Sequence, residues 1–211
     1  MKKKKMIPNK FAPVVYQALE NIVGKEWISQ DRAIVETYSK FSLDADGFLK
    51  KHEKDPSNIP ACIVLPGSTD EVQSIVRVAN RYNIPFVPFT NGQIFSGPTS
   101  PDPTICVHLS RMNKVLHIDE QNMTATLQAY ADYAQLIADA VKVGLWNGGT
   151  PLATTLCKLS SQSAFAGIWQ TSIKYGLLGR NIVSFTVVLP SGEILRTGSS
   201  AMAGAETFWA D

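Results

Sequence analysis

The chain has 211 residues, of which 45% are apolar and 18% charged, a composition typical of a globular protein with a buried core. Its apolar runs are far shorter than the roughly 20 residues of a membrane-spanning helix, and its start lacks the apolar stretch of a secretory signal, so we expect a cytoplasmic protein without a membrane span. The net charge of +2 includes four lysines at positions 2–5, and the remaining residues offer no clustered cations for binding nucleic acid.

The first helix and the first internal boundary are predicted from periodicity and composition. Residues 11–23 place their apolar side chains on one helical face, and Gly24 provides a stop signal. The polar segment 41–58 is typical of an exposed connection and is the best internal boundary.

A strand, a helix and a second strand follow this connection. Residues 61–65 form a short apolar strand, and Ser68 with Glu71 forms a capping box that begins a helix of about 14 residues. Residues 84–89 form the next strand. This pattern predicts a βαβ unit with parallel strands and a right-handed connection.

The loop of residues 90–98 is the least regular part of the chain and ends before a strand at 105–109. It therefore starts at the carboxyl end of a strand, where an α/β sheet usually binds ligands. Its glycines and serine allow a tight bend with inward-pointing N–H groups, which can hold phosphate without a lysine. The alternative is a surface loop that needs glycine for its backbone conformation.

Two hairpins and one helix are predicted in the second half. The hairpins comprise residues 115–128 and 184–197, and the helix between them covers 131–143. The segment 150–179 fits neither period. It is either loosely structured, or its small side chains let a ligand approach the backbone.

No residue cluster predicts catalysis or a metal site. The three cysteines (Cys62, Cys106 and Cys157) lie apart in apolar segments, which predicts buried thiols in a reducing compartment. His108 and His117 lie in predicted strands, where a structural role is the usual one, and the acidic start of a calcium loop near residue 44 is incomplete. Several aromatic residues are candidates for stacking on a flat cofactor or for ordinary core positions: Tyr38, Tyr130, Tyr133, Trp146, Trp169 and Tyr175.

Taken together, six segments in order resemble the FAD-binding, PCMH-type domain of the vanillyl-alcohol oxidase and p-cresol methylhydroxylase superfamily. These segments, which lie between about residues 59 and 197, are 61–66, 68–72, 84–88, 90–97, 109–115 and 187–195. The superfamily includes flavoproteins that are D-lactate and glycolate dehydrogenases. The resemblance implies an α+β fold of two subdomains, a small βαβ-containing one and a larger one with a mixed or antiparallel sheet and helices.

The resemblance implies FAD held between the two subdomains. The first loop would wrap the pyrophosphate, a small-residue segment would supply a second set of contacts, and further residues would lie near the flavin and the adenine end. The candidate cofactor-binding residues are Phe89, Thr90, Asn91, Gly92, Gln93, Ile94, Phe95, Ser96, Gly97, Leu159, Ser160, Ser161, Ser163, Ala164, Gly167, Tyr175, Gly176, Ile182 and Val183.

The sequence departs from the family pattern at three places. An Arg and a run of glycines common in the first loop are replaced here by Phe89, Thr90 and Asn91, and a Gly-Gly pair is replaced by Ser160 and Ser161. A serine keeps its backbone N–H, and its hydroxyl can donate to phosphate or to a flavin carbonyl. Residues 90–97 contain no His of the kind that attaches flavin covalently in some relatives, so we expect non-covalent FAD as far as this loop is concerned.

The resemblance also implies a domain organisation. We expect a helical lead-in and connection (1–58), the FAD-binding domain (59–200, with subdomains of about 59–110 and 111–200) and the start of a substrate or cap domain (201–211). The substrate domain would be missing here and would lie on the same gene or on a partner subunit. Catalytic residues come largely from that half, so none is named, and a fragment or subunit of this kind is expected to be inactive alone.

Three functional hypotheses follow. The first is the FAD-binding portion of an oxidoreductase that removes a hydride from an alcohol, a 2-hydroxy acid or a para-substituted phenol. Its partners would be that small-molecule substrate, the cap domain and an electron acceptor, in an oligomer. The second is a scaffold or assembly subunit that keeps the fold but has lost FAD. The third is an unrelated α/β nucleotide-binding module.

Overall fold

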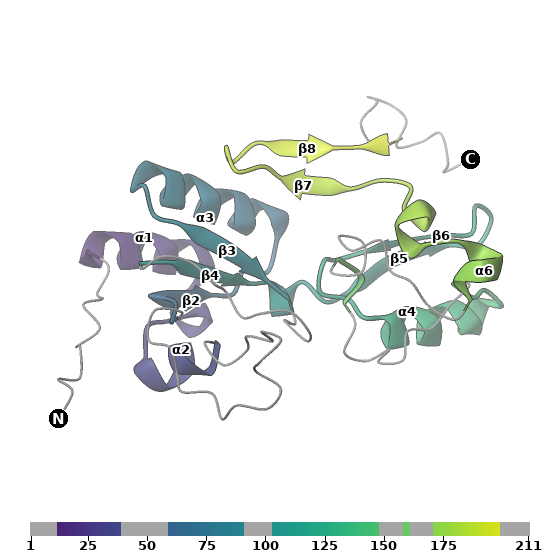
Figure 1. Ribbon diagram of the computed structural model, residues 1–211, viewed down its shortest axis with the longest axis horizontal. Coiled ribbons are helices and arrows are strands. Elements are labelled where there is room, and N and C mark those ends of the chain that lie inside the picture. The colour runs from purple at the N-terminus through teal and green to yellow at the C-terminus, as the bar shows by residue number, and fades with distance from the viewer. Residues whose placement is uncertain (1–11, 39–58, 91–102, 148–157, 161–170, 199–211) are drawn as a thin grey trace. The chain divides into compact units, whose positions relative to one another are not determined.

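The computed structural model describes residues 12–38, 59–90, 103–147, 158–160 and 171–198 (Figure 1). Helices accompany one mixed sheet and two small antiparallel sheets, so the predicted α+β class is confirmed. The chain divides into two compact units, Met1–His108 and Leu109–Asp211, each of which we describe by itself.

The first unit is built on a four-stranded sheet. Its strands, in the spatial order β1-β2-β4-β3, are β1 (Ile28–Ser29), β2 (Cys62–Val64), β4 (Ile105–His108) and β3 (Phe86–Phe89). Both β2 and β3 run parallel to β4, while β1 is antiparallel to β2. The predicted βαβ strands therefore share a direction, as expected, but β4 is inserted between them.

Two helices lie on one face of this sheet (Figure 1). α1 (Pro13–Val23) ends at Gly24, which has a φ of 89°, and the short helix η1 (Lys25–Trp27) leads into β1. α1 contacts α3 (Thr69–Arg81), and Leu19 of α1 and Ile75 of α3 are both fully buried. At 13 residues α3 is too short to cross a membrane, and no other helix among the described residues is long and apolar enough to do so.

The beginning of α3 is fixed locally. Ser68 Oγ accepts a hydrogen bond of 3.2 Å from the Glu71 backbone N–H, as the capping box predicts. The Glu71 carboxylate accepts instead from the Gly67 N–H, at 2.8 Å, one residue before the cap. The motif therefore anchors the turn between β2 and α3 as well as the helix.

The opposite face of the sheet is covered by α2 (Arg32–Tyr38). Val35 of α2 packs with Ile59, with Ile63 of β2 and with Cys106 of β4 in one buried cluster. Ile63 and Cys106 are paired in register and therefore share this face. Both Cys62 and Cys106 are free and buried, as predicted, and burial raises the pKa of the Cys106 thiol to about 12. Cys157 lies outside the described residues.

The second unit begins with η3 (Leu109–Arg111) and the first predicted hairpin. β5 (Val115–Asp119) and β6 (Thr124–Leu127) are antiparallel, with a bulge between Val115 and His117. α4 (Tyr133–Ala140) continues into η4 (Val141–Val143) and ends at Gly144, whose φ of 74° is left-handed. The predicted helix over 131–143 is therefore confirmed, with a 3-10 last turn.

The described part of the unit closes with the second hairpin. α6 (Ser172–Tyr175) and η5 (Leu178–Asn181) precede β7 (Thr186–Val188) and β8 (Ile194–Arg196), which are antiparallel. Gly192 lies in the turn with a φ of 83°, as the Pro-Ser-Gly signal predicts. We expected a larger sheet in this part of the chain; the described residues form two separate two-stranded antiparallel sheets.

Candidate functional site

The first predicted cofactor loop leaves the sheet of the first unit at the carboxyl ends of β3 and β4. Phe89 and His108 are the last residues of these strands and are paired in register. Phe89 and Thr90 are both half-buried. The loop residues from Asn91 to Gly97 lie outside the described residues, so their predicted contacts with FAD stay predictions.

A hydrogen-bonded chain crosses this end of the sheet. The Tyr38 hydroxyl lies 2.8 Å from His108 Nδ1, and His108 Nε2 lies 3.2 Å from the Thr90 carbonyl oxygen. A carbonyl oxygen only accepts hydrogen bonds, so Nε2 carries the ring proton and Nδ1 accepts from the tyrosine. His108 therefore connects the end of α2 to the first residue of the loop.

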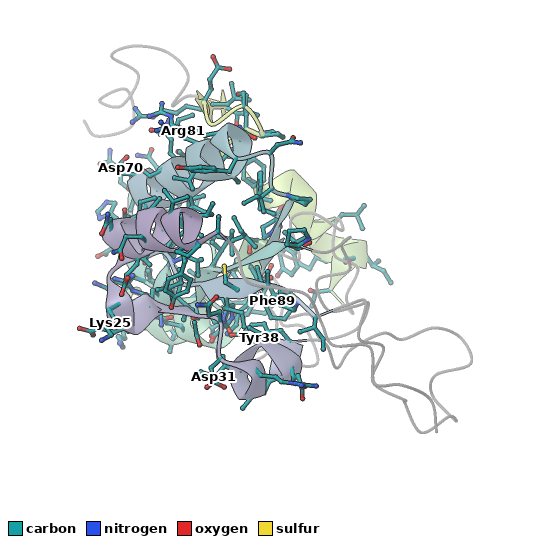
Figure 2. The ribbon with its side chains drawn as sticks, turned by 90° about the vertical axis from the view of Figure 1, so that its left-hand side faces the viewer. Lys25, Asp31, Tyr38, Asp70, Arg81 and Phe89 are labelled. Atoms are coloured by element: carbon teal, nitrogen blue, oxygen red, sulfur yellow. The ribbon has the colours of Figure 1, made fainter. Side chains whose placement is uncertain are left out.

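The environment of His108 favours the neutral form of its ring. Burial lowers its pKa below the usual value of 6.5, and the hydrogen bond with Thr90 opposes this effect in part. Tyr38, Phe89 and His108 also contact one another edge to face, with ring centroids 5.3 to 5.5 Å apart. Figure 2 shows Tyr38 at the end of α2 beside Phe89 of β3.

The second predicted cofactor segment starts at Leu159 in the second unit. Its first residues run beside the chain that enters α4: Lys158 bridges to Asp132, and the Leu159 N–H donates to the Ala131 carbonyl at 3.0 Å. The Ser160 hydroxyl donates to the Ala129 carbonyl. The hydroxyl proton of Ser160 is thus bonded within the protein, and the predicted contact of Ser160 with the cofactor stays a prediction.

The rest of that segment is outside the described residues. This applies to Ser161, Ser163, Ala164 and Gly167, so their assignment to the cofactor stays a prediction.

A third group of predicted residues lies before β7. Tyr175 contacts the Trp146 ring edge to face, with centroids 5.7 Å apart, and Gly176 follows with a φ of 79°. Ile182 is half-buried and Val183 is 59% exposed. Gly198 packs so closely on Val183 that an added Cβ would collide with the Val183 carbonyl oxygen. The backbone at Val183 is therefore held by a glycine that the sequence did not single out.

Two polar residues of the second unit that the sequence did not single out carry buried atoms without a partner among the described residues. The amide nitrogen and oxygen of Asn147 and the hydroxyl oxygen of Thr171 are buried and have no hydrogen-bond partner in the part of the chain that the structure describes. A buried amide or hydroxyl without a partner is costly, so such atoms favour a polar ligand. Both residues lie in segments without regular periodicity, which is why no pattern marked them.

The donors found here fit FAD better than a metal ion. The described residues of the second unit supply an amide, a hydroxyl and aromatic rings, and these groups suit a dinucleotide with a flat ring system. No group of three His, Cys, Asp or Glu side chains within the described ranges is arranged to hold a metal ion.

Comparisons with known proteins identify the family. A sequence model of the FAD binding domain matches residues 60–198. The chain is 32% identical over 170 residues to D-lactate dehydrogenase (cytochrome) 1, mitochondrial, of Saccharomyces cerevisiae, covering 77% of this chain and 29% of that protein.

Two solved structures are similar to this chain over most of its length. 4-ethylphenol oxidase from Gulosibacter chungangensis has a TM-score of 0.76 at 27% identity, over 94% of this chain and 37% of that one. p-Cresol methylhydroxylase has a TM-score of 0.78 at 19% identity, over 94% of this chain and 38% of that one, which shows a shared fold.

The chain thus spans about a third of the length of these proteins, and the family model covers more than half of the chain. Its matches include dehydrogenases and oxidases, and its α+β fold is that of p-cresol methylhydroxylase. The chain belongs to the FAD-binding domain family, in the PCMH-type form found in the vanillyl-alcohol oxidase and p-cresol methylhydroxylase flavoproteins.

Proposed function

We propose that this chain is the FAD-binding portion of a flavin-dependent oxidoreductase that removes a hydride from an alcohol, a 2-hydroxy acid or a para-substituted phenol. The observation that carries the proposal is the family match over residues 60–198. The named relatives support two of these three substrate classes, since D-lactate is a 2-hydroxy acid and 4-ethylphenol is a para-substituted phenol.

Non-covalent FAD is proposed as the cofactor, and when bound it would accept the hydride. The loop of residues 91–97 would hold the pyrophosphate through backbone N–H groups, and the segment from Leu159 to Gly167 would approach the flavin. Asn147 and Thr171 would contribute side-chain hydrogen bonds to FAD.

The substrate is proposed to bind with the help of a further domain. The chain spans 29% of the yeast D-lactate dehydrogenase and 37% of 4-ethylphenol oxidase, so much of each relative has no counterpart here. That domain would lie on the same gene or on a partner subunit, and with it the groups that take the substrate proton. An electron acceptor and an oligomeric assembly complete the proposal.

A scaffold subunit without FAD is the second candidate. One observation favours it: the Ser160 hydroxyl, at a position where the family pattern has glycine, is bonded to the Ala129 carbonyl within the protein.

The two candidates differ in one measurement. The purified chain is incubated with FAD, separated from free flavin by gel filtration and examined by visible absorption, with FMN as the matched ligand. Flavin bands that co-elute with the protein after FAD alone would support the proposed function. A colourless protein after incubation with excess FAD would favour the scaffold.

A further inference from the structure

We infer that His108 is a positioning residue for FAD: its ring, held between the Tyr38 hydroxyl and the Thr90 carbonyl, fixes the Thr90 backbone, where the chain enters the loop proposed to bind FAD. The inference rests on the proposed function. It goes beyond it by assigning a role to a histidine that the family pattern did not mark.

The position of His108 makes this role possible. His108 ends β4 and is paired in register with Phe89, which ends β3. Thr90 is the next residue of the chain and the first residue of the predicted loop. The His108 side chain at the end of β4 thus fixes the backbone where the chain leaves β3, through the 3.2 Å contact between Nε2 and the Thr90 carbonyl oxygen.

The ring is held from its other side as well. The Tyr38 hydroxyl donates to Nδ1 across 2.8 Å, from a residue that is 70 positions away in the sequence. The ring is also enclosed by Tyr38 and Phe89, which pack on the buried cluster around Val35. Both ring nitrogens are therefore occupied, and the rotation of the imidazole is restricted.

This arrangement matters for binding because a loop that holds an anion with backbone N–H groups binds it more tightly when less of the backbone has to be ordered. Any freedom at the loop's first residue is lost on binding and reduces the affinity. A hydrogen bond that fixes the Thr90 carbonyl removes part of this freedom before FAD arrives. The same bond leaves the reacting atoms untouched, so His108 acts through Thr90 and not on the substrate.

Three variants separate the hydrogen bond from the volume of the ring. His108→Leu keeps an apolar side chain of similar bulk but removes both bonds. His108→Gln retains an amide that can donate to Thr90 and an oxygen that can accept from Tyr38. Tyr38→Phe removes only the hydroxyl. His117→Leu is the matched control, because His117 is exposed on β5 in the other unit.

The FAD dissociation constant of each variant is measured by titration of the whole chain. We expect His108→Leu to weaken FAD binding by about three- to tenfold, the range of one net hydrogen bond, and Tyr38→Phe to have a smaller effect. His108→Gln should stay within about twofold of the parent, and His117→Leu should match it. Hydrogen exchange of the FAD-free protein should be faster over residues 86–90 in His108→Leu but not in His108→Gln.

The outcomes distinguish the two proposals. A parent chain that takes up no FAD would overturn the proposed function and the role of His108 in it. A parent that binds FAD, with His108→Leu equal to it in affinity and exchange, would overturn the role of His108 alone. Equal losses in the Leu and Gln variants would also overturn it, because they would show that only the shape of the ring matters.

Discussion

Asp132 makes two contacts with different segments: its Oδ1 accepts from the Gln135 N–H at the start of α4, and its Oδ2 lies 3.3 Å from Lys158 Nζ. The side chain of Lys158 is only 10% exposed and its ammonium group also lies 4.5 Å from the centre of the Tyr130 ring. One carboxylate thus caps a helix and neutralises a buried cation directly before the second predicted FAD segment.

Replacing Asp132 should separate these two roles. Asp132→Asn keeps a good helix cap but removes the negative charge 3.3 Å from Lys158, and we expect it to lower the free energy of unfolding by about 1–3 kcal/mol. Asp132→Ala should cost about 1 kcal/mol more, because the cap is lost too. Urea denaturation measures the unfolding free energy of each variant relative to the parent.

The control for Asp132 is a shorter ion pair on the surface. Lys142 lies 2.7 Å from Asp139, but its side chain is 70% exposed. Asp139→Asn should therefore cost under about 1 kcal/mol. Equal losses in Asp132→Asn and Asp139→Asn would show that burial of Lys158 contributes nothing.

Acidification should destabilise the protein through His108. Burial lowers the pKa of His108 in the folded state below 6.5, so the unfolded state binds the proton more readily. The stabilisation is complete above pH 6.5 and is lost as the pH falls toward the folded-state pKa. In thermal melts between pH 7.5 and 5, the parent should lose more stability than His108→Gln. Parallel pH profiles for the two proteins would contradict this prediction.

The contact between α1 and α3 should depend on the buried side of α1. Leu19 is fully buried and Val14 is 55% exposed on the same helix. Leu19→Ala should lower the free energy of unfolding by about 2–5 kcal/mol, because it leaves a cavity. Val14→Ala should change it by less than about 0.5 kcal/mol. Similar losses of unfolding free energy for Leu19→Ala and Val14→Ala in chemical denaturation would contradict the burial of Leu19 between α1 and α3.

Gly198 should tolerate no side chain. It has a φ of 65°, and a Cβ would collide with the Val183 carbonyl oxygen and lie 3.1 Å from Ser184 Cβ. Gly144 also has a positive φ, of 74°, but nothing lies within 4 Å of its added Cβ. Gly144→Ala should therefore cost about 1 kcal/mol from backbone strain alone, and Gly198→Ala distinctly more. Circular dichroism melts of the two variants test this difference.

Larger side chains in the first predicted cofactor loop should weaken FAD binding. We expect Gly92→Val and Gly97→Val each to weaken FAD binding by an amount on the order of 1–3 kcal/mol. The added side chain would collide with the pyrophosphate or would require a backbone φ angle that valine does not readily adopt. The far-ultraviolet spectrum should stay that of the parent. If both variants retain flavin through gel filtration as the parent does, the loop does not hold FAD.

Local signals in the sequence predicted local structure well. The Ser68–Glu71 spacing located the start of α3, and Gly144 located the end of the helical segment, because both depend on hydrogen bonds and backbone angles within a few residues. The candidate FAD segments came from resemblance, and most of their residues lie outside the described ranges, so their contacts remain predictions.

Relationships between distant residues were not accessible in the same way. Periodicity shows that residues 84–89 and 105–109 are strands, but not that β4 lies between β2 and β3. The contact of Tyr38 with His108 depends on that order and on the register of Phe89 with His108. The partner of the Ser160 hydroxyl likewise depends on a pairing with residues 129–132 that no local pattern records.

The position of β4 also bears on how the protein is made. During synthesis β2 and β3 leave the ribosome before the strand that joins them, and until residue 108 has emerged β3 has no neighbour in the sheet. A nascent chain that stops short of residue 105 would present open strand edges, which invite association with other chains. The sheet of the first unit is therefore complete only when its last strand has emerged, and a pause in translation before that point would prolong the exposure of these edges.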